Sequence, residues 1–327
     1  MPSTVRSSGP TPAGGKAARA AQRRAKAQQR EALARRAARR RQWTRWGGVA
    51  AAVLLLAVGI TYVASRGNDA ADSGAGGSAT APVVGGDLHT VTVIGDALYV
   101  GGHEAVAVSH DGGRQWQRIG SLDGADAMGW AITPDGVLVG GHPGLYRSTD
   151  HGATFTKLGG GAAVDDVHAL GAAAGIVYLG SPRSGLLAST DGGNSWQVRN
   201  AQTGRSFMGT ILVDPTDPAR LIAPDMSSGL SASSDGGRTW KPLGGPGGAM
   251  AAGWNPTDTK QIIAVGMSGG ARSIDGGATW QQIQLPAGVS AVSFDATGTT
   301  VYAGALDGRR ARLYRSGDGG TTWTATG

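Results

Sequence analysis

The sequence predicts an all-β protein, a six-bladed β-propeller, with an N-terminal transmembrane helix. Three observations carry this prediction: one short loop motif occurs six times, each repeat holds four strand-like segments, and twenty uncharged residues precede the repeats. A fixed spacing of about forty residues is typical of repeat architectures. We therefore expect a basic cytoplasmic tail at 1–46, the transmembrane helix at 47–65, a flexible linker at 66–84 and the propeller at 85–327.

The basic character of the chain belongs to its N-terminal tail. Residues 1–46 contain thirteen Lys and Arg residues against the single acid Glu31, whereas residues 47–327 contain seventeen basic and twenty-two acidic residues. The net charges are therefore +12 and −5. The tail lacks the stacking aromatic residues and the folded module of a nucleic-acid-binding protein, so we expect no nucleic-acid partner. Its Lys and Arg excess instead favours a cytoplasmic location beside anionic lipid.

The segment after the tail is long and apolar enough to cross a membrane. Residues 46–65 carry no charge, and twenty residues in a helix span roughly 30 Å, the thickness of a bilayer's hydrocarbon core. Trp43 and Trp46 lie at the basic end of the segment and Tyr62 lies near its other end, as expected for rings at the two interfaces. This pattern predicts a single-pass protein of the cell membrane, with a cytoplasmic N-terminus and the propeller outside. A signal peptide cleaved near Val63-Ala64-Ser65 is the alternative, and it would release the propeller.

Composition limits the remaining chemistry. The chain contains no cysteine, which excludes disulfides, a lipid anchor on a thiol and every metal site with a Cys ligand. Residues 66–84 are rich in Gly and Ala with Ser and Asp, a composition typical of a flexible tether. The 57 glycines of the chain suit a protein that contains many turns.

The repeated loop motif has a physical logic of its own. Its Asp can accept hydrogen bonds from backbone N–H groups two residues on, its glycines allow positive φ angles, and its aromatic ring covers the hairpin. We therefore expect these residues to build turns and to carry no chemistry. The motif residues are Asp111, Asp150, Asp191, Asp235, Asp275 and Asp318, with Trp116, Phe155, Trp196, Trp240, Trp280 and Trp323.

The motif S-x-D-x-G-x-T-W resembles the Asp-box, also called the BNR repeat, of bacterial sialidase-like propellers, sortilin-type receptors, xyloglucanases and photosystem assembly factors. Ser189-Thr-Asp191-Gly-Gly-Asn-Ser-Trp196 and Ser233-Ser-Asp235-Gly-Gly-Arg-Thr-Trp240 show the match. Two copies depart from it: Gln115 replaces the usual Thr, and the second copy has His151 for Gly and Phe155 for Trp. The resemblance implies a β-propeller with these loops between the third and fourth strands of each blade.

Each repeat contains four strand signals, which is the content of one propeller blade. In the first repeat they lie at 88–94, 97–101, 105–109 and 115–119. The propeller therefore begins on an innermost strand and ends on an outermost one, and no strand is left for exchange between the first and last blades. Closure must come from packing between blades, helped by Pro82-Val83-Val84. A monomeric propeller is expected.

Histidines and methionines recur at one end of the expected blades. Counting strands places the starts of innermost strands and the ends of second strands on one face, opposite the repeated loops. The starts carry His89, Met128, His168, Met208 and Met250, and the ends carry His103, His142, Met226 and Met267. His110 and His151 belong to loops on the other face.

Two interpretations of this cluster stay open. Adaptable Met and His side chains can fill a narrowing channel. Thioether and imidazole together also favour copper over hard cations, although no tight His-x-His or Met-x-x-Met spacing supports a metal. The candidate ligands for such a copper ion are His89, His103, His142, His168, Met128 and Met208.

The resemblance to sialidases implies an enzyme with a Tyr nucleophile, a Glu that polarises it, an acidic acid/base residue and three arginines. The propeller contains one glutamate, Glu104, and no Arg-Ile-Pro motif near the first blade. Asp126, Asp165 and Asp166 precede innermost strands, where a pair of acids at roughly 5 to 9 Å could hydrolyse a glycoside. Acids at such positions also commonly form turns or face solvent.

We therefore expect an extracytoplasmic binding module that receives a protein, a glycan or a soft metal ion at its axial face. An exo-acting, sialidase-like glycoside hydrolase is the alternative. The incomplete Tyr, Glu and Arg set argues against it, since a fold alone does not supply catalysis.

Overall fold

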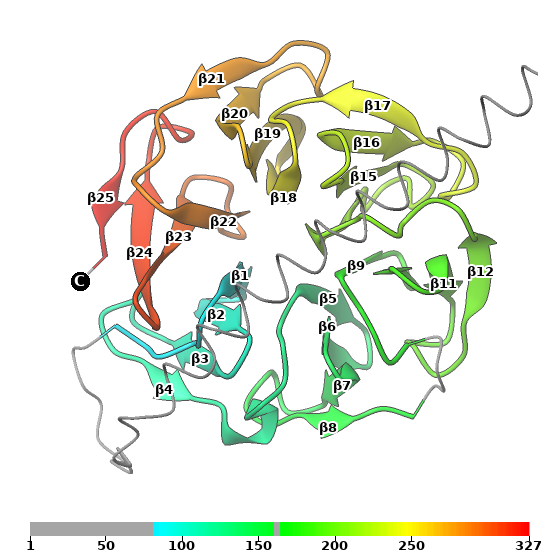
Figure 1. Ribbon diagram of the computed structural model, residues 1–327, viewed down its shortest axis with the longest axis horizontal. Helices are drawn as coiled ribbons and strands as arrows, with labels where there is room; N and C mark the ends of the chain where they lie inside the picture. The colour runs from blue at the N-terminus through cyan, green and yellow to red at the C-terminus, as the bar shows by residue number, and fades with distance from the viewer. Residues whose placement is uncertain (1–80, 160–163, 327) are drawn as a thin grey trace, which may run out of the picture. The chain divides into compact units, whose positions relative to one another are not determined.

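The computed structural model describes residues 81–159 and 164–326, which form a six-bladed β-propeller. Figure 1 shows the sheets around a central axis, each with its first strand innermost and its last strand at the rim. The prediction of an all-β, six-bladed propeller is confirmed. The transmembrane helix expected at 47–65 and the basic tail lie outside the described residues. Within those residues, no helix has the length and apolar character to cross a membrane.

In blades 1 to 3, four consecutive strands pair antiparallel, with register shifts in blades 1 and 3. Blade 1 consists of β1 (Leu88–Ile94), β2 (Ala97–Gly102), β3 (Val106–Ser109) and β4 (Gln117–Arg118). Blade 2 consists of β5 (Gly129–Thr133), β6 (Gly136–Gly141), β7 (Gly144–Ser148) and β8 (Thr156–Lys157). Blade 3 consists of β9 (Ala169–Ala173), β10 (Ile176–Ser181), β11 (Gly185–Ser189) and β12 (Gln197–Asn200). The strands expected in the first repeat agree with β1 to β4 within two residues.

Blade 4 has a divided innermost strand. β13 (Gly209–Thr210) pairs in parallel with β9, and β14 (Leu212–Val213) pairs with β15 (Leu221–Pro224). Between β13 and β14, the N–H of Ile211 donates to the carbonyl oxygen of Leu170 in blade 3 at 2.9 Å. This contact requires Gly171, because a Cβ atom there would overlap the Ile211 carbonyl. The blade is completed by β16 (Leu230–Ser233) and β17 (Lys241–Gly244).

Blades 5 and 6 return to the regular pattern. Blade 5 consists of β18 (Ala249–Asn255), β19 (Asp258–Gly266), β20 (Gly269–Ser273) and β21 (Gln281–Ile283). Blade 6 consists of β22 (Val289–Phe294), β23 (Val301–Asp307), β24 (Arg310–Ser316) and β25 (Thr324–Ala325). One element was not predicted: the short 3-10 turn η2 (Gly120–Leu122) follows blade 1, and its Leu122 is buried between blades 1 and 2.

The hydrophobic core is divided among the interfaces between blades. Each of six clusters of buried apolar residues combines side chains from two neighbouring blades. Tyr99 of blade 1 and Trp130 of blade 2, for example, pack with their ring centres 5.1 Å apart. Each blade therefore buries its apolar faces against its neighbours, as expected for a repeat architecture.

The ring closes where the N-terminal segment meets blade 6. Val84 is fully buried between blades 1 and 6, and its N–H donates to the carbonyl oxygen of Arg309 at 2.9 Å. Val83 forms an antiparallel bridge with Arg310 of β24. The segment Pro82-Val83-Val84 thus supports closure by pairing its backbone with β24, in addition to the packing between blades.

Candidate functional site

The six repeat loops, each running from the motif Ser to the aromatic residue, share one hydrogen-bond network. In blade 3, the hydroxyl of Ser189 donates to Asp191 Oδ1 at 2.7 Å and accepts the N–H of Gly193 at 2.8 Å. The same two bonds recur in the other five loops at 2.7 to 2.9 Å. Every one of these serines is buried, so its hydroxyl satisfies a backbone N–H that water does not reach.

The loop aspartates accept N–H groups further along the chain than expected. Asp191 Oδ1 accepts from residues three and four positions on, at 3.0 and 2.9 Å, and not from the residue two positions on. Its Oδ2 accepts the Ser195 hydroxyl at 2.5 Å, whereas the first loop has Gln115 at that position. The equivalent bonds in the fourth and fifth loops stabilise the charged carboxylates of Asp235 and Asp275. They lower the pKa of each to about 2, with the bond from the Thr239 or Thr279 hydroxyl making the largest contribution.

The aromatic residue of each loop packs into the cluster that its blade shares with the preceding one. Trp280 donates its Nε1–H to the carbonyl oxygen of Leu243 on the preceding blade at 3.0 Å. Phe155, the one substitution, is buried and meets Trp130 edge-on at 5.8 Å between ring centres. The five tryptophans are half-buried. The motif Ser and Asp side chains and the aromatic rings of these loops are thus occupied by contacts within the fold, although Trp323 Nε1 is buried without a hydrogen-bond partner among the described residues.

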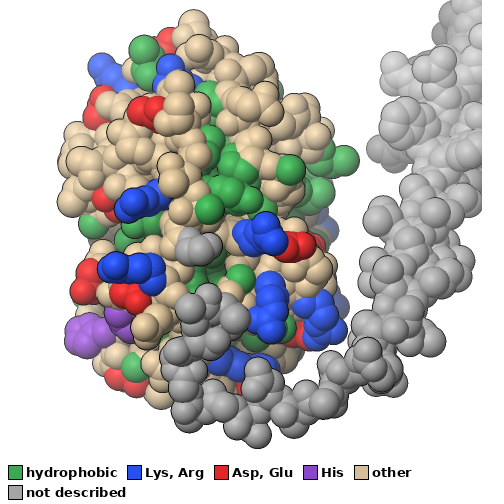
Figure 2. Space-filling model, turned by 90° about the vertical axis from the view of Figure 1, so that its left-hand side faces the viewer, with side chains coloured by type: hydrophobic (Ala, Val, Ile, Leu, Met, Phe, Trp, Pro, Cys, Tyr) green, Lys and Arg blue, Asp and Glu red, His purple; other side chains and the backbone are tan. Residues whose placement is uncertain are grey.

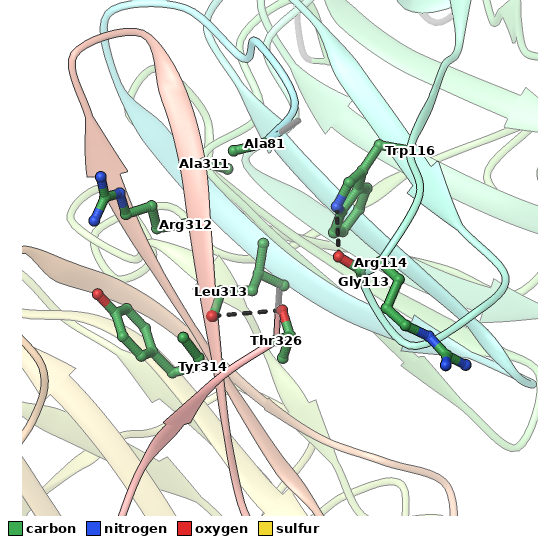
Figure 3. Close-up of a pocket in the computed structure, with 10 residues that line it drawn as sticks. Ala81, Gly113, Arg114, Trp116, Ala311, Arg312, Leu313, Tyr314 and Thr326 are labelled. Atoms are coloured by element: carbon green, nitrogen blue, oxygen red, sulfur yellow. Dashed lines mark hydrogen bonds between the residues drawn. The ribbon is translucent and has the colours of Figure 1, made fainter. Parts of the chain in front are cut away.

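A cavity of about 330 Å³ lies at the closing seam, on the same side as the repeat loops. Figure 3 shows Trp116 of the first loop across from Leu313 and Thr326 of blade 6, with the Arg114 side chain extending away from them. Trp116 donates its Nε1–H to a carbonyl within its own loop at 3.0 Å. The described lining contains two arginines but no Asp, Glu or His, so acid-base and metal-binding groups must be sought elsewhere.

Such groups gather on the opposite face, over blades 1 to 3. Figure 2 views the propeller from its edge and shows histidine side chains close to acidic ones at one side of the molecule. We call this surface the His/Asp face. It consists of Asp87, His89, His103, Asp126, His142, Asp166 and His168.

One short pattern places an acid at the entrance of each of these blades. The pattern reads Asp87-Leu-His89 in blade 1, Asp126-Ala-Met128 in blade 2 and Asp166-Val-His168 in blade 3. Alternate residues of an extended chain point to the same side, so the acid and the residue two positions on face the same way.

Contacts between blades bring two of these acids, Asp126 and Asp166, to a histidine of the preceding blade. The N–H of Val167 donates to the carbonyl oxygen of Gly141 at 3.1 Å, which sets Asp166 beside His142 at the end of β6. A Cβ atom on Gly140 would overlap the Val167 side chain. The glycine pair before His142 therefore allows the next blade to approach, and the same arrangement recurs between blades 1 and 2.

The best-defined group combines His142, Asp166 and His168. Asp166 Oδ1 lies 3.0 Å from His142 Nε2 and 3.0 Å from His168 Nε2. Asp166 is only 7% exposed, and its Oδ1 makes no hydrogen bond with any described residue. Burial lowers the pKa of His168, Asp166 opposes this effect and His142 adds to it. His168 is therefore uncharged at neutral pH, and its ring can offer a lone pair.

A second group combines Asp87, His89 and His103 at the entrance of blade 1. The rings of His89 and His103 have their centres 4.5 Å apart. Burial lowers the pKa of His89 to about 4, and its Nε2 is buried without a hydrogen-bond partner among the described residues. Asp87 is exposed, and its Oδ1 already accepts the N–H of Leu88 at 2.8 Å.

Asp126 lies between the two groups. Its Oδ2 is 3.5 Å from His142 Nδ1 and 4.0 Å from His103 Nε2. Burial raises the pKa of Asp126, and the two histidines oppose that rise. His142 therefore has a carboxylate oxygen facing each of its ring nitrogens, Asp126 at Nδ1 and Asp166 at Nε2.

The methionines proposed as ligands lie at the starts of innermost strands, as their sequence positions imply. Met128 is buried immediately before β5, and Met208 is half-buried before β13 on blade 4. The close partners of the histidines are instead Asp87, Asp126 and Asp166, a role that the sequence analysis missed. The repeated Asp-x-His spacing of blades 1 and 3 was the available signal.

The residues that a sialidase-like enzyme would need have other contacts. Glu104 pairs with Arg309 at the closing seam. The hydroxyls of Tyr99 and Tyr178 donate to backbone carbonyls of the next blade at 3.2 and 3.1 Å. The other described tyrosines lie on β7, β23 and β24.

The comparisons with known proteins establish the fold and no closer relationship. No protein-family model matches the chain, and no curated protein matches its sequence. A chain of the nidogen/laminin complex aligns with a TM-score of 0.56 at 11% identity, covering 70% of this chain and 91% of that one. The GH74 xyloglucanase from Xanthomonas campestris aligns with a TM-score of 0.50 at 20% identity, covering 76% and 46% respectively.

The extracellular domain of a putative one-component system from B. thetaiotaomicron aligns with a TM-score of 0.50 at 10% identity. This alignment covers 77% of the present chain and 39% of the other. The chain thus spans less than half the length of this domain and of the xyloglucanase. At these identities the likeness shows a β-propeller fold alone.

Proposed function

We propose that the chain is a membrane-anchored, extracytoplasmic binding propeller that receives its ligand on the His/Asp face. The observation that supports this most is the convergence of four histidines and three acids at one mouth of the propeller, over three adjacent blades. Concave or central surfaces with a few convergent polar groups are the usual places for ligands. A chain of the nidogen/laminin complex shares the fold, so a protein ligand is a reasonable candidate here.

The repeat loops are, in this proposal, Asp-boxes with a purely structural role. Their Ser and Asp side chains bond to their own backbone, and their aromatic residues pack between blades. They lie on the face opposite the His/Asp face, so the proposal assigns them no ligand. The His/Asp face is therefore the surface whose side chains the proposal assigns to ligand binding.

A glycoside hydrolase is the second candidate, favoured by one observation. Burial raises the pKa of Asp126, which is the property of a general acid, and Asp166 lies near it across His142. Sialidase-like chemistry is disfavoured, because Glu104 is paired with Arg309 and the hydroxyls of Tyr99 and Tyr178 are bonded to backbone carbonyls. The fold shared with a xyloglucanase does not decide between binding and hydrolysis.

Crosslinking of the full-length chain in intact cells separates the two candidates. A photoreactive residue replaces Arg183, whose side chain is 68% exposed beside Asp166, or His110, which lies in a loop on the other face. A binding propeller predicts adducts from position 183 and none from position 110. The adducts from position 183 should vanish in His142→Ala. Turnover of aryl glycosides by the purified chain, lost in Asp126→Asn, would instead establish the hydrolase.

The anchor proposed at 47–65 has its own test. A tag placed after Gly327 should be reached by antibody outside intact cells, and the protein should stay with membranes washed at high pH. Release of a soluble propeller lacking residues 1–65 would show that the segment is a cleaved signal peptide.

A further inference from the structure

We propose that His142, Asp166 and His168 form a binding site for one divalent transition-metal ion such as zinc. The inference goes beyond the proposed function and does not depend on it, since a metal could support either a bound partner or a reaction. Its ligands would be Nε2 of His142, Oδ1 of Asp166 and Nε2 of His168. These come from the end of β6 and from the segment that enters β9.

The spacing of the three ligand atoms suits a metal. Asp166 Oδ1 lies 3.0 Å from each imidazole nitrogen, and all three atoms lie within 4.8 Å of one another. In a tetrahedral zinc site with bonds of about 2.0 to 2.1 Å, ligand atoms are roughly 3.3 Å apart. Small movements of the side chains would therefore produce the coordination geometry.

An independent observation shows that the oxygen lacks a partner. Asp166 Oδ1 is buried, and the two imidazole nitrogens that lie 3.0 Å from it do not meet it with the angles of a good hydrogen bond. A buried carboxylate oxygen without a partner costs free energy. A cation bound between the oxygen and the two imidazole nitrogens would satisfy all three atoms at once.

The surroundings of the group orient its ligands. Asp126 Oδ2 lies 3.5 Å from His142 Nδ1, which is the arrangement of a carboxylate that fixes a metal-binding histidine from behind. Arg183 lies 3.6 Å from Oδ2 of Asp166, so the guanidinium holds the outer oxygen and leaves Oδ1 to point inward. Asp126 is therefore a positioning residue and not a ligand.

The ligand set selects the class of ion. Two imidazoles and one carboxylate suit zinc and its neighbours, whereas Mg²⁺ and Ca²⁺ prefer cages of oxygen atoms. Copper(II) should bind as well, because imidazole affinity rises toward copper along the divalent series. A copper(I) site would need the thioethers of Met128 or Met208, and no ligand of the proposed group is a thioether.

The experiment uses the full-length chain in detergent, stripped with chelator and titrated with Zn²⁺ against a chromophoric chelator. All six histidines lie at or after residue 89 and the chain has no cysteine, so the tail adds no competing His or Cys ligand. One equivalent should bind, and Mg²⁺ should not displace it. His142→Ala, His168→Ala or Asp166→Asn should weaken binding at least 100-fold, and Asp126→Asn by about 10 to 100-fold.

His110→Ala is the control, because His110 is exposed in a repeat loop on the opposite face of the propeller. It should leave zinc affinity within a few-fold of the unchanged protein. Cobalt(II) gives a second readout, since a site with nitrogen and oxygen ligands should produce visible absorption bands that His142→Ala removes. Melting curves in chelator show that each variant is folded. Folded protein that binds no zinc, or that loses it equally in His110→Ala and His142→Ala, would overturn the proposal.

Discussion

The Oδ1 atom of Asp166 lies 3.0 Å from the Nε2 atom of His168, two residues further along the same entering segment of blade 3. His142 approaches the same oxygen from blade 2, also at 3.0 Å. The group is therefore assembled across an interface between two blades. A change that separates these blades should disturb the group even where no member of it is altered.

The first prediction follows from the close approach at Gly140. Gly140→Ala places a Cβ atom against Val167, and overpacking of this kind costs about 1 to 3 kcal/mol of unfolding free energy. The displaced blade should also weaken zinc binding. Chemical denaturation and zinc titration of the same sample measure both effects.

Gly317→Ala serves as the control, because a Cβ atom there would have no atom within 4 Å. Stability and zinc affinity should both stay unchanged in this variant. An equally stable Gly140→Ala protein with full zinc affinity would show that the interface does not set the geometry of the group.

The second prediction concerns the repeat loops. Ser189→Ala leaves the buried N–H of Gly193 without its acceptor, and an unsatisfied buried group costs about 1 to 3 kcal/mol. Zinc affinity should be unaffected, because the loop lies on the other face. Ser195→Ala, which removes an exposed hydroxyl from the same loop, should cost less. Urea unfolding compares the two, and loss of zinc binding in Ser189→Ala would contradict the separation of the faces.

The third prediction is a loss of stability in acid. The pKa of Asp235 and of Asp275 is about 2 in the folded protein against an ordinary value of 3.8. The unfolded chain therefore takes up these protons first as the pH falls. The stabilisation should be fully present above about pH 4 and disappear progressively toward pH 2. Urea unfolding at pH 7, 4 and 2 measures it, and Asp275→Asn should reduce the dependence. Constant stability over this range would contradict the account of the loops.

The fourth prediction tests closure of the ring. Val84→Ala removes a fully buried side chain between blades 1 and 6, and the loss should be about 2 kcal/mol of unfolding free energy. Val83→Ala, at the neighbouring and exposed position, should cost much less. Thermal unfolding distinguishes them. Equal effects would mean that the segment adds backbone pairing but no buried contact.

The fold could be predicted because each repeat contains a local sequence pattern that specifies its own hairpin. Ser189, Asp191 and Trp196 define one hairpin, and the six-fold recurrence of that pattern set the number of blades. The split of the innermost strand in blade 4 could not be foreseen. It depends on the contact of Ile211 with Leu170 in another blade, which no local pattern encodes.

The candidate site was predicted in part. Strand counting placed His89, His142 and His168 on one face, where the structure has them. Equivalent positions within the blades group these histidines with methionines. The acidic partners come from another relationship: the entrance of one blade touches the end of the second strand of the preceding blade, as Asp166 touches His142. That relationship exists only once the blades are packed.

The most direct test of the account is X-ray absorption at the zinc edge of the full-length protein loaded with one equivalent of Zn²⁺. The His/Asp face predicts a first shell of nitrogen and oxygen at about 2.0 to 2.1 Å, with outer-shell scattering from two imidazole rings. His142→Ala should remove one of these rings. A shell that contains sulfur near 2.3 Å, or water oxygens without imidazole, would contradict the assignment of His142, Asp166 and His168 as the ligands.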